Sequence, residues 1–374
     1  MFVVFIVAIV STLLAYSASK GNKYGLHQAF ILITLFFCFR YDFGSDYLAY
    51  LQMFNNINRY NIGLLDFNSL SIFSEKGELG WVLLNKLFNP FGFFGLIAFL
   101  SILENYIIFK MIKSYVPVLY QWLAVFIFSF SPALFLIGPC SMLRQWLAVV
   151  LFLYSIKYIA SNNYIKYFII TAIAISVHTS AWIMAPIYLF SFIKKINFRG
   201  SKLLIYVVSF YILWTIFAPS VFSNNLSFLL DFEDFSYYTN YLGDKQSNVS
   251  MSIFGLFSYV VMNLFLPFMV LLNLHKLKSE YLYFALLYLM WQLLLPLQSV
   301  VPMVSRLGYY FLIFNIIAIP IALYLYKGNY KKVVFCGVLL FMIFSARELS
   351  TLSSGASWKS FATYKTIFSV PYWL

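Results

Sequence analysis

Residues 142–160 read MLRQWLAVVLFLYSIKYIA, an apolar segment with charged side chains near both of its ends. The mostly apolar segment from Leu143 to Ala160 approaches the roughly 20 residues needed to cross a bilayer, with Arg144 and Gln145 near its start and Lys157 near its end. The stretch therefore predicts a transmembrane helix whose two ends carry polar side chains.

The composition of the chain extends this prediction to all 374 residues. The sequence is 63% hydrophobic and only 10% charged, whereas a soluble domain carries roughly a quarter charged residues. The first apolar run, from Met1 to Ala18, has no basic residue before its apolar core, so we interpret it as a retained helix and not as a signal peptide. Residues 1–374 are predicted to form a single integral membrane domain of all-α, polytopic fold.

The apolar runs give the number of helices. They recur from end to end of the chain, and some contain proline, a break that membrane helices tolerate where neighbouring helices bond the freed backbone groups. We expect about 12 transmembrane helices, within a range of roughly 10 to 14. The runs centre near residues 1–17, 26–39, 91–109, 118–137, 143–160, 164–177, 181–193, 203–218, 253–274, 281–297, 307–326 and 333–345.

The charged residues orient these helices. Successive connections between the predicted helices lie on alternate sides of the membrane, which divides them into two sets. One set holds 15 of the 25 basic residues and only two acidic residues, Glu104 and Glu280. The positive-inside rule makes this set cytoplasmic and places both termini outside. The net charge of +13 thus reflects membrane topology and gives no argument for nucleic-acid binding. Three external segments exceed a turn, residues 40–90, 219–250 and 346–374, and we expect short interfacial helices in them.

Polar residues gather at the predicted outer helix ends, first in residues 39–50, FRYDFGSDYLAY. Two interpretations of Arg40 are open, a phosphate ligand or a side chain that snorkels to the interface. Gly44 predicts a helix C-cap, followed by a new helix with Ser45 or Asp46 near its N-cap. Asp42 and Asp46 lack the Asp-x-Asp spacing of metal-dependent sugar transferases, so we expect neither a metal nor a cofactor.

Further outward candidates follow along the chain. An arginine at mid-bilayer costs at least about 2.5 kcal/mol, so arginines at the ends of apolar runs imply a partner, a water-filled cavity or an anionic ligand. Arg144 with Gln145 opens an apolar run where free N–H groups favour an anion, which predicts a phosphate site. Arg306, in PMVSRLGYYF, is the third phosphate candidate. His178 is the outward histidine and our candidate base, with Glu78 as the alternative base.

These motifs occur in an order that is similar to a known family. FRYDFGSDYLAYLQMF, EKGELGWVLLNKLF, MLRQWLAVVLFLYSIKY, AISVHTSAWI, SRLGYYF and YKTIFSVPYWL resemble the EpsG-like branch of the Wzy-type bacterial polysaccharide polymerases. The resemblance covers nearly the whole chain. One departure is Ser45, where many members carry threonine.

The resemblance implies assembly of a surface polysaccharide such as O-antigen or capsule, at the outer face of the bacterial cytoplasmic (inner) membrane. The growing glycan would pass from undecaprenyl diphosphate to a sugar hydroxyl of the next lipid-linked repeat unit. Arginine forks bind phosphate in a bidentate manner and would take the place of a metal ion. Arg40, Arg144 and Arg306 would hold the diphosphate, and Asp42, Asp46 and Gln145 would bind the acceptor or support the arginines. Direct displacement would invert the anomeric carbon.

Two alternative functions stay open at the level of sequence. A flippase for lipid-linked oligosaccharides would bind the same diphosphate, but alternating access predicts charges near the bilayer midplane, whereas the candidates lie at outer ends. A polyprenyl-phosphate-dependent membrane glycosyltransferase would use an acidic pair in the first external loop. The expected partners are lipid-linked oligosaccharides and membrane lipid, with a chain-length regulator and a flippase as further partners and no nucleic acid.

Overall fold

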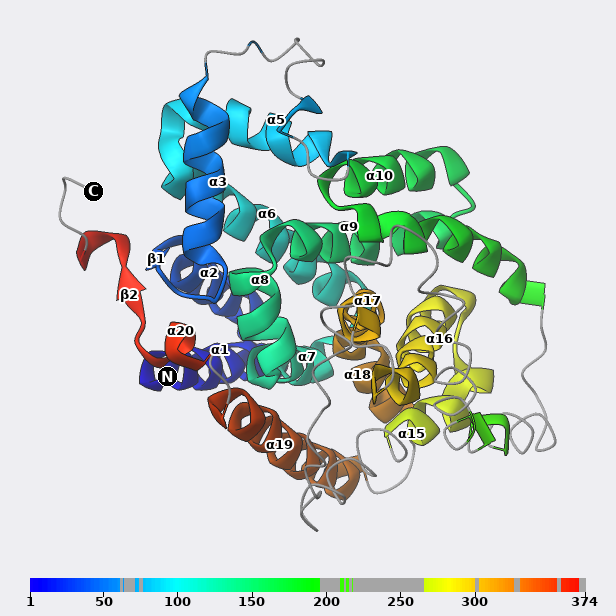
Figure 1. The fold of residues 1–374 in the computed structure, drawn as a ribbon. Helices are drawn as coiled ribbons and strands as arrows, with labels where there is room; N and C mark the ends of the chain where they lie inside the picture. The colour runs from blue at the N-terminus through cyan, green and yellow to red at the C-terminus, as the bar shows by residue number, and fades with distance from the viewer. Residues whose placement is uncertain are drawn as a thin grey trace. The chain divides into compact units, whose positions relative to one another are not determined.

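The computed structural model describes residues 1–60, 63, 71–73, 77–195, 209–211, 213–214, 217, 266–299, 303–325, 330–354 and 358–369 (Figure 1). Two compact units divide the chain, one formed by Met1–Ser191 with Ser345–Leu374 and the other by Phe192–Phe344. The predicted external segment 219–250 lies outside the described residues. Described elements in both units are almost all helices, which confirms the all-α prediction.

The first unit carries most of the candidate site. Its α-helices are α1 (Phe2–Ser19), α2 (Gly25–Cys38), α3 (Tyr47–Arg59), α5 (Leu79–Leu87), α6 (Gly92–Tyr115), α7 (Gln121–Phe130), α8 (Gly138–Ser141), α9 (Leu143–Ala160), α10 (Tyr164–Val177) and α20 (Lys359–Ala362). Its remaining elements are the strands β1 (Arg40–Tyr41) and β2 (Lys365–Thr366), the π-helical turn η4 (Ala133–Ile137) and the 3₁₀ segments η2 (Asn89–Phe91), η3 (Val118–Tyr120), η5 (Thr179–Lys195) and η10 (Ile367–Ser369).

The second unit is helical in its described part. Its helices are α15 (Leu266–Asn273), α16 (Ser279–Leu294), α17 (Met303–Leu312) and α18 (Asn315–Leu325), with the 3₁₀ segments η7 (Leu274–Lys276) and η8 (Leu295–Ser299). Helix α16 packs against α17 and α18. The 25-residue α19 (Tyr330–Ser354) begins in this unit and ends in the first.

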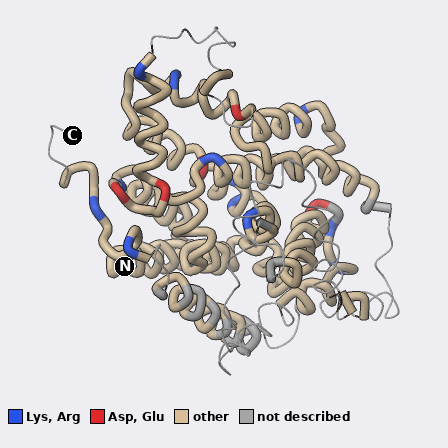
Figure 2. The backbone as a smooth tube through the Cα atoms, viewed as in Figure 1, with Lys and Arg blue, Asp and Glu red and all other residues tan. Residues whose placement is uncertain are grey.

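Charged positions are sparse along the described backbone (Figure 2). Four described helices are long and apolar enough to span a membrane, and counting each of two bent pairs as one span gives up to six. The chain is therefore a membrane protein, and the expectation of about 12 spans stays a prediction. Shorter apolar helices at 25–38, 164–177 and 179–192 fall below the length of a span.

The apolar run 118–137, which the sequence pattern predicted to be interrupted at Pro132, is broken at that position. Helix α7 ends at Phe130, and the following segment turns by 74°. Ser131 adopts an extended conformation with ψ of 113° because the ring of Pro132 excludes a helical conformation at the preceding residue. After the break, α8 ends at Ser141, directly before α9, whose second residue is the candidate Arg144.

The position of Glu104 differs from the one that the charge pattern predicted. The sequence pattern assigned it to a cytoplasmic connection, but it lies inside the 24-residue α6 and is only 3% exposed. The apolar character of its helical neighbours outweighs a single carboxyl group when the helix forms. A carboxyl group thus occupies the interior of a candidate membrane span.

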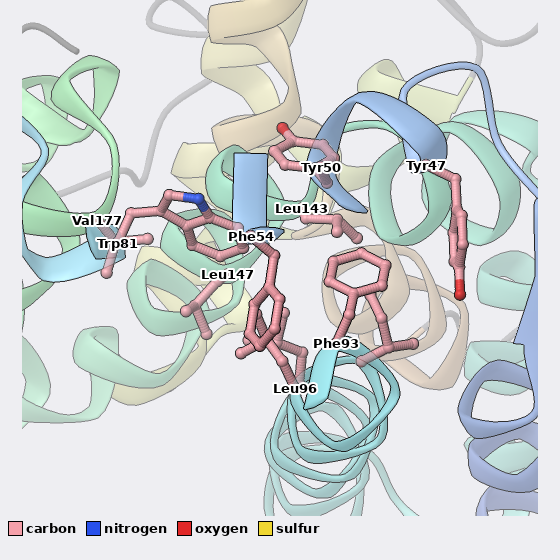
Figure 3. Packing of buried hydrophobic residues seen from close by; sticks show 11 residues of the cluster. Tyr47, Tyr50, Phe54, Trp81, Phe93, Leu96, Leu143, Leu147 and Val177 are labelled. Atoms are coloured by element: carbon pink, nitrogen blue, oxygen red, sulfur yellow. The ribbon is translucent and has the colours of Figure 1, made fainter. Parts of the chain in front are cut away.

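An aromatic core joins the helices that carry the candidate site (Figure 3). Tyr47, Tyr50 and Phe54 from α3 pack with Trp81 of α5 and with Phe93 of α6. Edge-to-face contacts join Tyr50 to Trp81 and Tyr47 to Phe93, with ring centroids 5.6 and 5.3 Å apart. Such pairs add roughly 0.5–1.5 kcal/mol each to the burial of the rings. The core therefore fixes α3 and α5 against the start of α9.

The C-terminal segment 358–369, which we call the C-terminal strap, packs on the loop after α2. Strand β2 pairs antiparallel with β1, with Arg40 opposite Thr366 and Tyr41 opposite Lys365. Gly44 donates its N–H to the Ser360 carbonyl, and the N-terminal ammonium of Met1 donates to the Ala362 carbonyl. The C-terminal strap thus contacts both the N-terminus of the chain and the loop that precedes α3.

Candidate functional site

Glu78 is the centre of the candidate site, and it contacts two of the other candidates. Its Oε2 accepts a hydrogen bond from a terminal nitrogen of Arg144 at 2.6 Å, and its Oε1 lies 2.7 Å from Nδ1 of His178. The backbone N–H of Thr179 also donates to Oε1, at 3.0 Å. Three residues that the sequence proposed separately therefore form one cluster.

Helix ends bring these side chains together. Glu78 is the N-cap residue of α5, Arg144 is the second residue of α9, and His178 follows the last residue of α10. Helix α10 packs against both α9 and α5. The Glu78 side chain makes no capping bond to its own helix, so its carboxylate points to the neighbouring helices.

Gly80 permits the close approach of α5 to α10. A Cβ atom at this position would lie 2.3 Å from Oγ of Ser176 and 2.9 Å from the Ser176 carbonyl carbon. A side chain larger than hydrogen would therefore push α5 away from the end of α10. Gly80, the second glycine of the EKGELGW motif, thus sets the distance between Glu78 and His178.

The environment of Glu78 keeps its carboxylate ionised. Burial alone would raise the pKa of this group, but the hydrogen bond from His178, the charge of Arg144 and the Thr179 N–H together lower it below 4.5. The Glu78 side chain is only 4% exposed, whereas those of Arg144 and His178 are 19% and 24% exposed. The carboxylate is therefore enclosed, and its two cationic or titratable partners reach the surface.

This arrangement fixes the tautomer of His178. An ionised carboxylate only accepts hydrogen bonds, so Nδ1 of His178 must donate to Glu78. In the neutral ring the lone pair then lies on Nε2, on the edge of the ring that faces away from Glu78. A carboxylate that orients a histidine and stabilises its protonated form is the arrangement used for general-base catalysis.

The ring of Tyr50 packs beside the Arg144 guanidinium. The Arg144 guanidinium carbon lies 5.8 Å from the centroid of the Tyr50 ring, within the range of a cation–π interaction. Burial raises the pKa of the Tyr50 hydroxyl, and the nearby charge of Arg144 opposes this rise. Sequence reasoning missed Tyr50, although the ring lies one helical turn after Asp46.

Arg40 lies apart from this cluster and is 1% exposed. Its terminal nitrogens donate to the carbonyls of Phe37 and Pro139, at 2.6 and 2.8 Å, and to the Ser101 hydroxyl at 3.0 Å. The guanidinium thus joins α2, α6 and α8 in the interior of the first unit. Arg40 is neither at the surface, as the snorkelling interpretation required, nor open to a ligand in this structure; its predicted phosphate contact stays a prediction.

The two aspartates of the loop have different surroundings. Asp42 accepts a hydrogen bond from Lys365 of the C-terminal strap at 3.0 Å. Asp46 is exposed and is the N-cap residue of α3, as predicted, although its side chain makes no capping bond. The predicted helix C-cap at Gly44 is wrong, because α2 already ends at Cys38. The chain continues as strand β1, which pairs with β2.

Gly44 serves a close contact instead. Its φ of 122° lies in a region that favours glycine, and an added Cβ would lie 2.2 Å from the Cys140 carbonyl oxygen. The N–H of Ser45 donates to the Ser141 hydroxyl of α8 at 3.0 Å. The loop is therefore fixed on α8, directly before the helix that carries Arg144.

The last two candidates are placed differently. Gln145 is 4% exposed within α9, next to Arg144. Arg306 is exposed on α17 in the second unit. Two contributors were not singled out by sequence reasoning: Tyr50 and Lys365, which lies in the last of the quoted motifs.

The fold and the cluster define a class of protein: a helical membrane protein with a buried carboxylate that holds an arginine and a histidine at helix ends. A family model for the EpsG family matches residues 23–366, and the chain belongs to this family. Membership indicates, in broad terms, a glycosyltransferase-like polysaccharide polymerase. No curated protein and no solved structure matches the chain.

Proposed function

We propose that the chain polymerises oligosaccharide repeat units carried on undecaprenyl diphosphate, at the outer face of the bacterial cytoplasmic membrane. The single observation that supports this most strongly is the carboxylate of Glu78 between Arg144 and His178. A base and a cation side by side match the two requirements of the transfer, which are a deprotonated sugar hydroxyl and a stabilised diphosphate.

In the proposed reaction His178 is the base and Glu78 orients it. Nε2 of His178 takes the proton of an acceptor hydroxyl, whose oxygen then bonds to the anomeric carbon of the growing glycan. The bond from that carbon to the diphosphate breaks, and the leaving diphosphate keeps the electron pair. Because the hydroxyl attacks opposite the leaving group, the anomeric carbon is inverted.

Arg144 is the proposed diphosphate ligand of this cluster. It lies in the first turn of α9, where the helix dipole adds to its positive charge, and 19% of its side chain is exposed. Arg306 is proposed as a second diphosphate ligand. Asp46, exposed one turn before Tyr50, is the proposed contact for acceptor hydroxyls, and no metal is required.

Purified full-length chain with a lipid-diphosphate-linked repeat unit tests this proposal. The wild type should form ladders of polymerised repeats on a gel, in the presence of chelator, while the His178→Ala and Arg144→Ala variants should leave single repeats. Glu280→Gln, an exposed carboxylate in the first turn of α16, serves as the control. Ladders of normal length from both site variants would refute the assignment.

A transporter of lipid-linked oligosaccharide is the second candidate, and one observation favours it. Glu104 is buried in the interior of α6, where a transporter places charged groups. The two functions differ in where single repeats collect when the chain is absent from cells. A missing transporter strands them on the cytoplasmic leaflet, whereas a missing polymerase strands them on the outer leaflet.

A further inference from the structure

Three lysines of the first unit converge where α6 and α9 end and α10 begins. The ammonium of Lys157 lies 3.4 Å from the centroid of the Tyr154 ring and 4.7 Å from that of Tyr158. Lys110 lies 5.9 Å from the Tyr154 ring, and Lys166 lies 5.9 Å from the Tyr158 ring. We call these five residues the lysine–tyrosine cluster.

The cluster is separate from the candidate active site. Arg144 and Lys157 lie on the same helix, 13 positions apart, so at 1.5 Å per residue their Cα atoms are about 20 Å apart along its axis. Lys166 belongs to the first turn of α10, whereas His178 follows its last residue. The two sites are thus at opposite ends of the same helix pair.

Positive charge in this cluster has no carboxylate to balance it among the described residues. The ion pairs of the described part of the chain involve Glu78 and Asp42, and none includes Lys110, Lys157 or Lys166. The nearest acid on α6, Glu104, is buried inside its helix. Like charges that share two rings repel one another, so an anion bound between them would be stabilised.

Exposed apolar side chains continue from the cluster along two helices. On α6, Ile102 and Tyr106 are each 55% exposed and precede Lys110 at intervals of four residues, so the three share one helical face. On α10, Ile169 and Ile173 are 54% and 50% exposed and follow Lys166 at intervals of three and four. Lys110 and Lys166 therefore each lie at the end of an apolar stripe.

We propose that the lysine–tyrosine cluster binds the phosphodiester headgroup of an anionic phospholipid. Lysine ammonium groups match the charge of the phosphate, and the tyrosine rings suit the boundary between headgroup and acyl chain. The two apolar stripes would contact the acyl chains of the same lipid. A free phosphate ion would use the ammonium groups but not the stripes, and this difference separates the two sources of phosphate.

Lipid binding to the full-length chain in neutral detergent tests the proposal by native mass spectrometry. Phosphatidylglycerol and phosphatidylcholine with identical acyl chains are titrated in parallel, and the first should bind and the second should not. Each lysine near an anionic lipid contributes about fivefold to affinity. The triple variant Lys110→Gln, Lys157→Gln and Lys166→Gln should therefore bind phosphatidylglycerol on the order of a hundredfold more weakly.

A matched control removes the same number of charges elsewhere in the first unit. Lys20, Lys23 and Lys113 stack on separate rings, at 5.4, 5.1 and 5.4 Å, and share none of them. The corresponding triple glutamine variant should keep wild-type affinity. Equal losses in both triple variants would overturn the proposal, since they would report net charge alone.

Two further arms complete the test. A triple arginine variant of Lys110, Lys157 and Lys166 should retain phosphatidylglycerol, and its loss would show that charge is not what binds. Inorganic phosphate should fail to displace the lipid, and displacement at equal concentration would overturn the assignment to a lipid. Thermal unfolding of each variant is the control for folding. The unfolding midpoint should stay close to that of the wild type, because the three lysines are exposed or half-buried.

Discussion

Replacing Glu78 with glutamine is the sharpest test of the cluster, because the shape of the side chain is preserved and its charge is removed. The carboxylate accepts hydrogen bonds from Arg144, His178 and the Thr179 N–H. A glutamine has only one acceptor oxygen. If that oxygen faces His178, the amide NH₂ group faces Arg144, and a donor then meets a donor.

The cost to stability follows from this geometry. A hydrogen bond to a charged group contributes about 1.5–3 kcal/mol, and breaking a fully buried ion pair costs about 3–5 kcal/mol. Arg144 is 19% exposed and regains some hydration, so we expect the lower figure, near 2 kcal/mol. Glu78→Gln should therefore lower the midpoint of thermal unfolding in detergent, whereas Glu280→Gln should leave it unchanged.

The effect on catalysis should be larger than the effect on stability. Without the carboxylate, the tautomer and the orientation of the His178 ring lose their support. General-base catalysis contributes about 10²–10⁴ to a rate, so turnover of lipid-linked repeats should fall at least about 100-fold. Adding His178→Ala to Glu78→Gln should cost little more, because the two residues act as one unit. Wild-type turnover by Glu78→Gln would refute the proposed dyad.

The pH dependence of stability carries an independent check on Glu78. Its pKa is lower in the folded chain than the ordinary 4.5, so its ionised form stabilises the fold above that value. This contribution is lost as pH falls through the depressed folded pKa. The difference in unfolding midpoint between wild type and Glu78→Gln should therefore be full at pH 6 and vanish in stronger acid. A difference that grew on acidification would contradict the direction of the shift.

Four further substitutions test how the structure holds the site. Gly80→Ala should reduce turnover by forcing α5 from Ser176, while Gly337→Ala, whose Cβ would have its nearest neighbour 3.9 Å away, should not. Gly44→Ala should lower the unfolding midpoint by forcing a side chain against Cys140, at a cost of about 1–3 kcal/mol. Arg40→Lys should also lower the unfolding midpoint, because one ammonium cannot reproduce the planar guanidinium that donates to three acceptors. Loss of polymer with an unchanged unfolding midpoint would instead favour contact of Arg40 with a ligand.

The boundaries of α9 and α10 could be predicted from the sequence because apolar runs and polar ends coincide there. Leu143–Ala160 and Tyr164–Val177 are helices with the predicted limits. The contact of Glu78 with Arg144 and His178 could not be predicted, since 66 and 100 residues separate the partners. It depends on how α5 packs on α10, and one glycine sets that distance. Sequence position alone names the polar groups but does not pair them.

The contrast between Arg40 and Arg144 shows why similar sequence contexts gave different surroundings. Both arginines adjoin apolar runs, but Arg40 follows the end of α2, where carbonyl groups of the last turn lack helical partners. The Phe37 carbonyl of this turn and the Pro139 carbonyl of α8 accept hydrogen bonds from its guanidinium.

Arg144 lies at the start of α9, where the backbone offers N–H donors and the dipole opposes a cation. Such an arginine needs an anion, and in this structure Glu78 supplies it. The same requirement makes the start of α9 suited to the diphosphate of the proposed substrate, whose negative charge would meet the guanidinium and the helix terminus together. The end of the helix, more than the residue type, decides whether an arginine lies beside backbone carbonyl groups, as Arg40 does, or beside backbone N–H groups, as Arg144 does.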